Sequence, residues 1–248
     1  MEEYVAGDGS IIENVTQTKD LGIMMTTEID FREQITEVKN RGRRMSGWIL
    51  RTFNTRDELL MLTLFKSLVL PILEYACVLW SPQAVGQVRE IESVQRYFTS
   101  KINNMSNLNY WERLRSLKIF SLERRRDRYA IIYVMKILKG IVPNFTENEY
   151  KIQMYNSGRR GLLCKIPDLK SRATARLKSI KDRSFAVKGP KLFNTIPFEL
   201  RNCDISMEVF KSKLDKWLLQ IPDRPCLPNY QGQNAASNSV IDQANNIH

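Results

Sequence analysis

The chain has 248 residues and a formal net charge of +11, with 38 Lys and Arg against 27 Asp and Glu. Apolar residues make up 43% of it, which is enough for a hydrophobic core in one large or two small domains. A surplus of positive charge favours a polyanionic partner such as nucleic acid. The surplus is concentrated, because residues 158–192 hold 11 basic and two acidic residues.

The cysteines and the histidine argue against a metal site. Cys77, Cys164, Cys203 and Cys226 are far apart in the sequence, and the single histidine is the last residue, His248. A structural zinc ion needs four closely grouped ligands. We therefore expect no metal, no cofactor and reduced thiols in an intracellular protein.

Targeting signals are missing from the sequence. No apolar run reaches the roughly 18 residues of a membrane span. The first residues also lack the basic and apolar regions of a signal peptide. We therefore expect a cytoplasmic or nuclear protein, or one found in both compartments, with no membrane partner.

Catalytic patterns are missing as well. Two-metal nucleotidyl transfer requires clustered carboxylates, and the sequence has neither an Asp-Asp nor an Asp-x-Asp pair. It also has no Gly-x-Ser-x-Gly nucleophile elbow and no Gly-rich phosphate loop. We therefore predict no catalytic residue, and we do not expect this chain alone to act as a polymerase.

Residues 1–25 predict a short β-hairpin. Ile11–Ile12, Val15 and Leu21–Met24 are short apolar stretches that glycine and asparagine interrupt. A two-stranded hairpin alone is marginally stable in water, and no larger sheet follows in the sequence. We therefore expect its strands to expose unpaired edges.

Residues 26–142 predict a bundle of helices. The first begins near Glu28, since apolar or small residues then recur at steps of three and four as far as Thr52. Gly42 and Gly47 weaken it by about 1 kcal/mol each relative to alanine. Glycine on a helix face also permits the close approach of a neighbouring helix.

The second helix begins at the capping box Thr55–Glu58. Pro71 removes a backbone donor, and we expect a kink there because the apolar face continues to Leu79. This helix is apolar on nearly all sides, which is typical of the centre of a core.

Three more helices follow at recognisable caps. The third begins at Ser81–Pro82, the fourth at Asn109, and the fifth at Ser121, with Gly140 as its end. The connections are short, so neighbouring helices should pack antiparallel.

After Pro143 the helical period is lost. We expect loops, brief strands and one helical turn near Leu192–Phe193, and then a last helix that Ser206 caps and Pro222 ends. The last residues are rich in Asn, Gln, Ser and Ala, a composition typical of disorder. The fold class is therefore mainly α, with a β-hairpin, a helical bundle, a small irregular α+β basic module and a disordered tail, at residues 1–25, 26–142, 143–226 and 227–248.

Two clusters of basic residues are candidates for phosphate contact. One lies on the fifth helix and just before it, where the alternative is pairing with Glu112, Glu123 and Asp127 on the helix surface. The other lies within residues 159–191, where basic side chains could neutralise phosphates and aromatic rings could stack on bases. The candidate nucleic-acid-binding residues are Arg113, Arg115, Arg124, Arg125, Arg128, Arg159, Arg160, Arg172, Arg176, Lys178 and Lys181.

The aromatic residues of the helices are expected to pack in the core. They fall mostly on the predicted buried faces, and a buried Tyr or Trp needs a partner for its polar atom. The residues concerned are Trp48, Tyr75, Trp80, Tyr97, Trp111, Tyr129, Tyr133 and Trp217.

A series of short phrases, in a fixed order, resembles one known family. The phrases cover roughly Tyr4 to Pro225, and each is weak alone, but their order and spacing make the likeness specific. They resemble the part that follows the catalytic palm in reverse transcriptases of non-LTR retrotransposons of the jockey and CR1-like group. The phrases are Lys19–Ile23, Leu64–Tyr75, Trp80–Pro82, Ile91–Thr99, Tyr110–Leu114, Ser121–Arg126, Arg183–Phe185, Gly189–Asn194, Ile196–Pro197, Leu200–Arg201, Phe210–Lys211, Leu214–Asp215 and Trp217–Leu218.

This resemblance implies a C-terminal fragment of an RNA-directed DNA polymerase without its catalytic palm. The hairpin would be a remnant of the palm, the helices would form the thumb, and the basic module would handle RNA or target DNA. The expected partners are RNA or an RNA–DNA primer–template duplex, and a separately encoded palm-containing polymerase fragment. The alternative is a degenerate or repurposed retroelement fragment that binds protein through its bundle or has no function. Phe193 stands where the family often has tryptophan.

Overall fold

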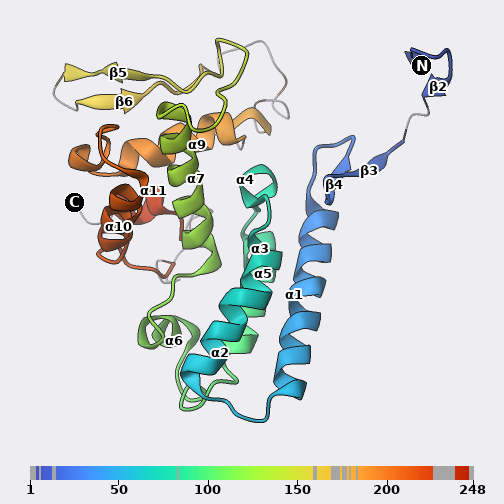
Figure 1. Ribbon diagram of the computed structural model, residues 1–248, viewed down its shortest axis with the longest axis vertical. Helices are drawn as coiled ribbons and strands as arrows, with labels where there is room; N and C mark the ends of the chain where they lie inside the picture. The colour runs from blue at the N-terminus through green and yellow to red at the C-terminus, as the bar shows by residue number, and fades with distance from the viewer. Residues whose placement is uncertain are drawn as a thin grey trace.

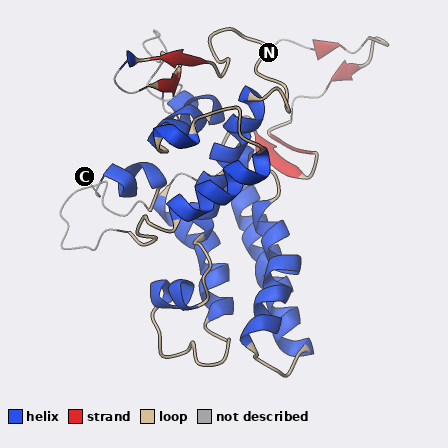
Figure 2. Cartoon of the chain, turned by 60° about the vertical axis from the view of Figure 1, so that its left-hand side comes forward, coloured by secondary structure: helices blue, strands red, loops and turns tan. Residues whose placement is uncertain are grey.

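The protein is mainly helical, with three small antiparallel hairpins in the described part of the chain (Figures 1 and 2). The structure is a computed structural model. It describes residues 4–5, 7–12, 15–82, 84–158, 161–168, 174, 178, 180–182, 184–225 and 238–245. The predicted mainly α class is confirmed.

Two hairpins lie at the N-terminus, where the sequence predicted one. The strands β1 (Tyr4–Val5) and β2 (Ile11–Ile12) form the first, and β3 (Gln17–Asp20) and β4 (Ile23–Thr26) form the second. The second turns through Leu21 and Gly22, both at positive φ, as a two-residue turn of this kind requires. Only Ile23 of this hairpin is buried.

The first long helix is confirmed as α1 (Arg32–Thr52). Its buried face includes Ile35, Val38, Gly42 and Ile49, at the predicted spacing. A Cβ atom at Gly42 would lie 2.7 Å from Leu73 Cδ2, so the glycine allows the next helical segment to approach α1 closely.

The second helix changes its geometry before Pro71. It runs through α2 (Glu58–Leu64), a π-helical turn η1 (Phe65–Val69) and α3 (Leu70–Glu74). A π turn is a recognised way to accommodate a residue that cannot continue the i to i−4 ladder. The predicted cap at Thr55 is wrong by two residues, because Asp57 accepts from the Leu60 amide at 3.1 Å.

The second helix also ends earlier than predicted. It stops at Tyr75, after which Ala76 adopts a left-handed φ of 49° and the short α4 (Cys77–Trp80) begins. Leu79 is exposed rather than part of a continuing apolar face, whereas Trp80 is fully buried. Its indole nitrogen donates to the Tyr75 carbonyl at 2.7 Å.

The next three helices largely follow the predicted caps. The third, α5 (Val85–Thr99), begins at Ala84 and not at Ser81–Pro82. Asn109 and Glu112 form the predicted capping box of α6 (Tyr110–Ser116). Ser121 caps α7 (Leu122–Leu138), which ends before Gly140 at a positive φ of 68°.

The buried apolar residues form two clusters that meet at α7. The first core contains buried side chains from Ile23 to Leu122, contributed mainly by α1, α2–η1–α3 and α5. The second core begins at Ala130, inside α7, and extends to Val240. The N-terminal part of α7 therefore belongs to the first core and its C-terminal part to the second, whereas the sequence placed the boundary after residue 142. Figure 1 shows α7 between the two groups of helices.

The second core is assembled from short elements. The strands β5 (Met154–Asn156) and β6 (Leu162–Cys164) pair near α9 (Phe185–Thr195), which packs along α7. The single helical turn predicted near Leu192–Phe193 is therefore wrong, because a full helix forms there with Pro190 inside it. A turn η3 (Phe198–Leu200) and α10 (Met207–Leu218), capped by Ser206 as predicted, complete this part.

The tail prediction is wrong for residues 238–245. They contain α11 (Val240–Asn245), and the side chain of Val240 is fully buried in the second core. The Val240 amide donates to Asp127 Oδ2 at 2.9 Å, which ties the segment to α7. The remaining residues of the predicted tail, 227–237 and 246–248, lie outside the described residues.

Candidate nucleic-acid interface

Arg124, the central arginine of the predicted cluster, is inside the protein. Its side chain is fully buried, and its guanidinium donates to the carbonyls of Leu218, Ile221 and Pro222, at 3.3, 3.3 and 2.8 Å. Leu218 is the last residue of α10, and Ile221 and Pro222 follow it in the segment where the helical hydrogen-bond ladder has ended. The prediction that Arg124 contacts phosphate is therefore wrong, because the side chain is buried and its two Nη atoms donate to carbonyls inside the fold.

Arg113 is a second correction. It is 6% exposed, and its guanidinium donates to Thr99 Oγ1, to the Leu108 carbonyl and to the Arg96 carbonyl, at 3.2, 2.6 and 3.1 Å. These bonds connect α6 to the end of α5. Arg113 is thus a structural residue of the first core and not part of the surface.

Arg125 and Arg128 are half-buried and engaged in ion pairs. Arg125 binds Glu74 at the end of α3, with Nη2 3.0 Å from Oε2, and Arg128 binds Asp215 on α10, with Nη2 2.8 Å from Oδ2. The alternative of ion pairing is therefore observed, but the partners lie on other helices and not on the surface of the same helix. Arg125 therefore connects α7 to α3, and Arg128 connects α7 to α10.

The remaining candidates are divided between exposed and undescribed residues. Arg115 and Lys178 are exposed, and Lys181 is half-exposed beside the Tyr150 ring, 5.8 Å from its centroid. A hydrogen bond with Tyr150 raises the pKa of Lys181. Arg159, Arg160, Arg172 and Arg176 lie outside the described residues.

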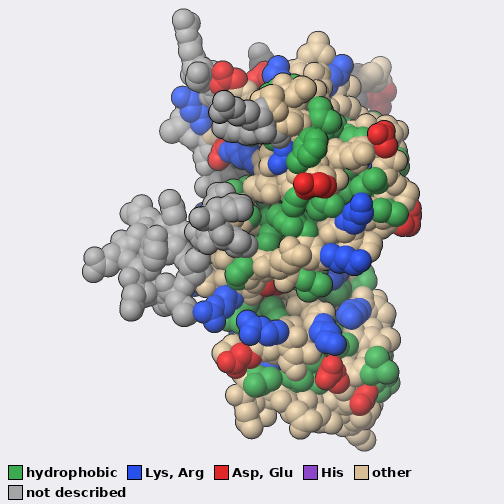
Figure 3. Space-filling model, turned by 90° about the vertical axis from the view of Figure 1, so that its left-hand side faces the viewer, with side chains coloured by type: hydrophobic (Ala, Val, Ile, Leu, Met, Phe, Trp, Pro, Cys, Tyr) green, Lys and Arg blue, Asp and Glu red, His purple; other side chains and the backbone are tan. Residues whose placement is uncertain are grey.

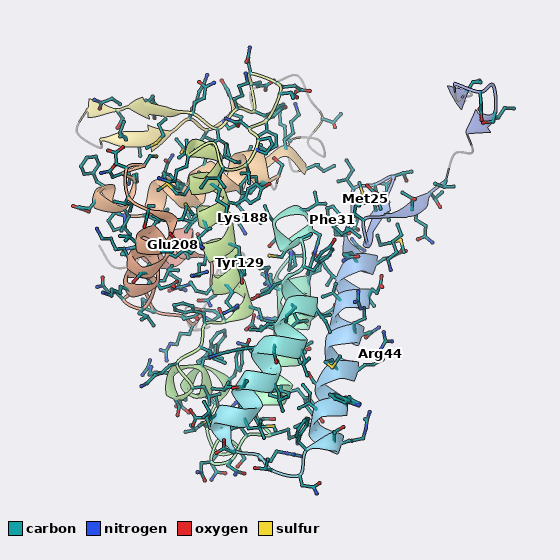
Figure 4. The ribbon with its side chains drawn as sticks, in the orientation of Figure 1. Met25, Phe31, Arg44, Tyr129, Lys188 and Glu208 are labelled. Atoms are coloured by element: carbon teal, nitrogen blue, oxygen red, sulfur yellow. The ribbon has the colours of Figure 1, made fainter. Side chains whose placement is uncertain are left out.

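A group of basic residues that the sequence analysis did not select lies on α1. Arg41, Arg44, Trp48 and Arg51 follow one another at steps of three, four and three, so they share one face of the helix. We call these four residues the α1 outer face. All are exposed, and Trp48 retains 47% of its accessible surface. In Figure 4, Arg44 points away from the helices that pack against α1.

The arginines of the α1 outer face are free within the described part of the chain. No described side chain makes a hydrogen bond or ion pair with Arg41, Arg44 or Arg51. By contrast, Lys39 pairs with Glu90 at 2.7 Å and Arg43 donates to Ser93 at 3.0 Å, so these two residues join α1 to α5.

The length of this face suits a nucleic-acid strand. With a rise of about 1.5 Å per residue, Arg41 and Arg51 are separated by about 15 Å along the helix axis. Phosphates on one strand of a duplex advance by about 3.4 Å per nucleotide. The face therefore extends over about four nucleotide steps, which three arginines can contact at intervals.

The prediction that nearly all of the helical aromatic residues pack in the core is wrong. Trp111, Tyr129 and Trp217 are half-buried. Trp80 is buried, but Trp48, Tyr75, Tyr97 and Tyr133 are exposed. An exposed tryptophan between arginines on a helix is a pattern that the sequence contains at 41–51. A search for cations at helical spacing, and not for runs of consecutive cations, would have found it.

The face of the molecule drawn in Figure 3 carries charges of both signs. On the face drawn in Figure 3, Lys and Arg side chains are interspersed with Asp, Glu and apolar side chains. Among the described residues, no three His, Cys, Asp or Glu side chains converge as metal ligands would. None of the described helices combines the length and apolarity that crossing a bilayer requires.

The sequence is similar to an uncharacterized protein of Caenorhabditis elegans. The two are 24% identical over 127 residues, which make up 50% of this chain. The chain spans 64% of the length of that relative. No family model matches the sequence, and no solved structure matches the chain.

Proposed function

We propose that this chain binds the backbone of RNA or of an RNA–DNA duplex through the α1 outer face. The observation that carries the proposal is a set of three exposed arginines that have no partner among the described residues. They lie beside an exposed tryptophan on one face of a long helix. The resemblance to non-LTR reverse transcriptases supports the same reading, in which the chain is a thumb-like bundle with a C-terminal module and has no polymerase active site.

The expected binding is directed at phosphates and carries little sequence preference. Each arginine can present a planar pair of donors to a phosphate and release condensed counterions. Contacts to the backbone fix the position of a protein on a nucleic acid but do not read its bases. Trp48 adds apolar and π contact with sugars or with an unstacked base.

The test is a titration of a labelled RNA–DNA duplex with the full chain, repeated at several salt concentrations from about 50 to about 200 mM. The variant Arg41→Gln, Arg44→Gln, Arg51→Gln should weaken binding by about 10- to 100-fold at the lowest salt, at about 0.5–1 kcal/mol per contact. Its slope of log K against log salt should be smaller by about 2–3, since three phosphate contacts are lost.

A matched control removes the same charge elsewhere. Lys165, Lys213 and Lys216 are exposed on the second-core side of the chain. The triple change of these lysines to Gln should alter affinity by less than threefold. Equal losses in both triple variants would show that net charge alone attracts the duplex, and the assignment to α1 would then be rejected.

A second candidate function follows from the N-terminal hairpins. All four residues of β3 are exposed, and Leu21, Met25 and Ile29 expose apolar side chains on or beside this hairpin. Exposed strand edges with apolar neighbours are sites at which another chain can add a strand. This arrangement favours docking of a second polypeptide, for which a palm-containing polymerase fragment is our proposed partner.

Co-purification of the chain with a palm-containing fragment tests this second candidate. Met25→Glu places a charge on the hairpin face and should reduce the recovered partner at least tenfold, whereas Lys213→Gln should not. Unchanged recovery with the Met25 variant would exclude the hairpin as the docking surface. If the unchanged chain does not recover the palm-containing fragment, this candidate is rejected. The alternative of a fragment without this partner then stands.

A further inference from the structure

A groove of about 610 Å³ lies between α3–α4 and α7, away from the α1 outer face. Its apolar lining includes Leu70, Pro71 and Ile132. One wall of the groove comes from η1, α3 and α4, and the other wall comes from α7, the helix that both cores share. Its volume falls within the range of about 300–1,000 Å³ that is typical of small-ligand sites.

Two tyrosines flank this groove from different helices. Tyr75, at the end of α3, is 57% exposed, and its hydroxyl donates to the Leu21 carbonyl at 3.0 Å, which fixes the ring against the β3–β4 turn. Tyr133 is on α7 and is 38% exposed, and its ring contacts Phe185 edge-on at 5.2 Å between centroids. Each ring is held by a neighbour while part of it remains accessible.

The charges around the groove are predominantly positive. Lys66 on η1 and Lys136 on α7 line it, and neither forms an ion pair with a described residue. Glu74 is the acidic residue of the lining, and Arg125 and the Tyr129 hydroxyl already bind it. Tyr129 is labelled on α7 in Figure 4. With Glu74 neutralised by Arg125, the two lysines are left to attract an anion.

We propose that this groove binds an unpaired nucleotide of a single strand, with the base against Tyr133 and the phosphates at Lys66 and Lys136. The inference rests on the proposed function, because it assigns a second site for the same class of partner. Aromatic rings next to a cationic rim are the pattern that single-strand binding uses, since every base has a π face. An acidic peptide would satisfy the lysines but would leave the Tyr133 ring without a planar partner.

The test compares two probes on the full chain. One is a fluorescein-labelled single-stranded oligouridylate, and the other is a blunt RNA–DNA duplex without unpaired nucleotides. The variant Lys66→Gln, Lys136→Gln and the variant Tyr133→Leu should each weaken single-strand binding about tenfold or more and change duplex binding less than twofold. The arginine triple variant of α1 should show the reverse preference.

Controls separate a lost site from a lost fold. Lys213→Gln, Lys216→Gln removes two exposed charges outside the groove and should leave both affinities unchanged. If Tyr133→Leu lowers the melting temperature, the result of the lysine variant tests the groove instead. That variant should leave the fold intact, because Lys66 is exposed and Lys136 has no ion-pair partner among the described residues.

The two proposals fail in different ways. Duplex binding by the unchanged protein without single-strand binding would overturn the groove and leave the α1 assignment intact. Single-strand binding that the groove variants do not weaken would also overturn it. Binding of an oligoglutamate peptide as tight as that of the oligouridylate would show that the groove attracts charge alone.

Discussion

The two cores of this protein are built in different ways. The first core is formed by long helical segments that follow one another in the chain, from α1 to the start of α7. The second combines the C-terminal part of α7 with β5, β6, α9, α10 and α11, some of which are separated by long stretches of sequence. Local periodicity therefore dominates one core, and long-range contact dominates the other.

The arginines of α1 and of α7 also differ in what they contact. On α1, Arg41, Arg44 and Arg51 lie on the outer face and have no described partner. On α7, Arg124 and Arg128 hold α10 in place, the first by three carbonyls and the second by an ion pair. A dense run of arginines in a sequence can thus serve assembly, while a sparse, periodic set remains available to a ligand.

The largest expected effect is the loss of the buried arginine. Arg124→Ala removes the Arg124 donors from the carbonyls of Ile221 and Pro222, and it leaves the Leu218 carbonyl with the Ile221 amide alone. We expect a loss of about 3 kcal/mol in the free energy of unfolding. Urea denaturation measures this loss. Hydrogen exchange should show that protection falls first in α10 and α11 and only later in α1 and α5.

A conservative variant sharpens this result. Arg124→Lys keeps the charge but cannot present the same planar fork to three carbonyls, so it should recover part of the lost stability. A loss below about 1 kcal/mol for Arg124→Ala would contradict the view that this arginine holds the second core to α7.

The next effect concerns Glu123, in the first turn of α7. Burial and the neighbouring Asp127 raise its pKa to about 7, against the opposing effect of Arg126 and Lys188. Its pKa in the unfolded chain is about 4.3. The folded protein therefore binds more protons between these two values, so its stability falls as pH rises through this window.

Glu123→Gln should remove this loss, since the amide has the same size and no charge. We expect the variant to be more stable than the unchanged protein by on the order of 2 kcal/mol at pH 8, and equal to it near pH 4. Denaturation at a series of pH values checks the window. Glu149→Gln, at an exposed loop position, is the matched control and should show no such crossover.

Helices of the first core could be predicted because their signals are local. Apolar residues at steps of three and four predicted α1, and the capping residues Asn109 and Ser121 marked the starts of α6 and α7. Two of the deviations lie near proline. The π turn before Pro71 and the late start of α5 after Pro82 depend on packing, which the cap signals do not report.

Elements of the second core were missed because tertiary contacts override local preference. Pro190 suggested a loop, but it is buried within α9, and a Cβ atom at Gly189 would lie 3.0 Å from Val134 Cγ2, so the glycine lets α9 approach α7 closely. The segment with Val240 is polar on average, yet one buried valine and the contacts to Asp127 attach it to the core. Composition averages over these few decisive residues.

Candidate interface residues were predicted less well than helices, for a related reason. Consecutive arginines on a helix point in several directions, and the sequence does not say which of them meet carbonyl groups of distant segments. Arg113 and Arg124 became internal donors in this way. The α1 outer face needed no distant partner, and its spacing around Trp48 was readable in the sequence.

The smallest expected effect is that of the half-exposed ion pair between Arg128 and Asp215. It joins the same two helices as Arg124, but the arginine side chain is 20% and the aspartate side chain 39% exposed, so solvent screens the attraction. A double-mutant cycle with Arg128→Ala and Asp215→Ala should give a coupling energy of about 0.2–1 kcal/mol, and less at high salt. Because both arginines lie on α7 and both contact α10, the difference between them isolates the effect of burial. A coupling energy for Arg128 as large as the loss for Arg124→Ala would mean that charge, and not satisfaction of buried carbonyls, holds the second core to α7.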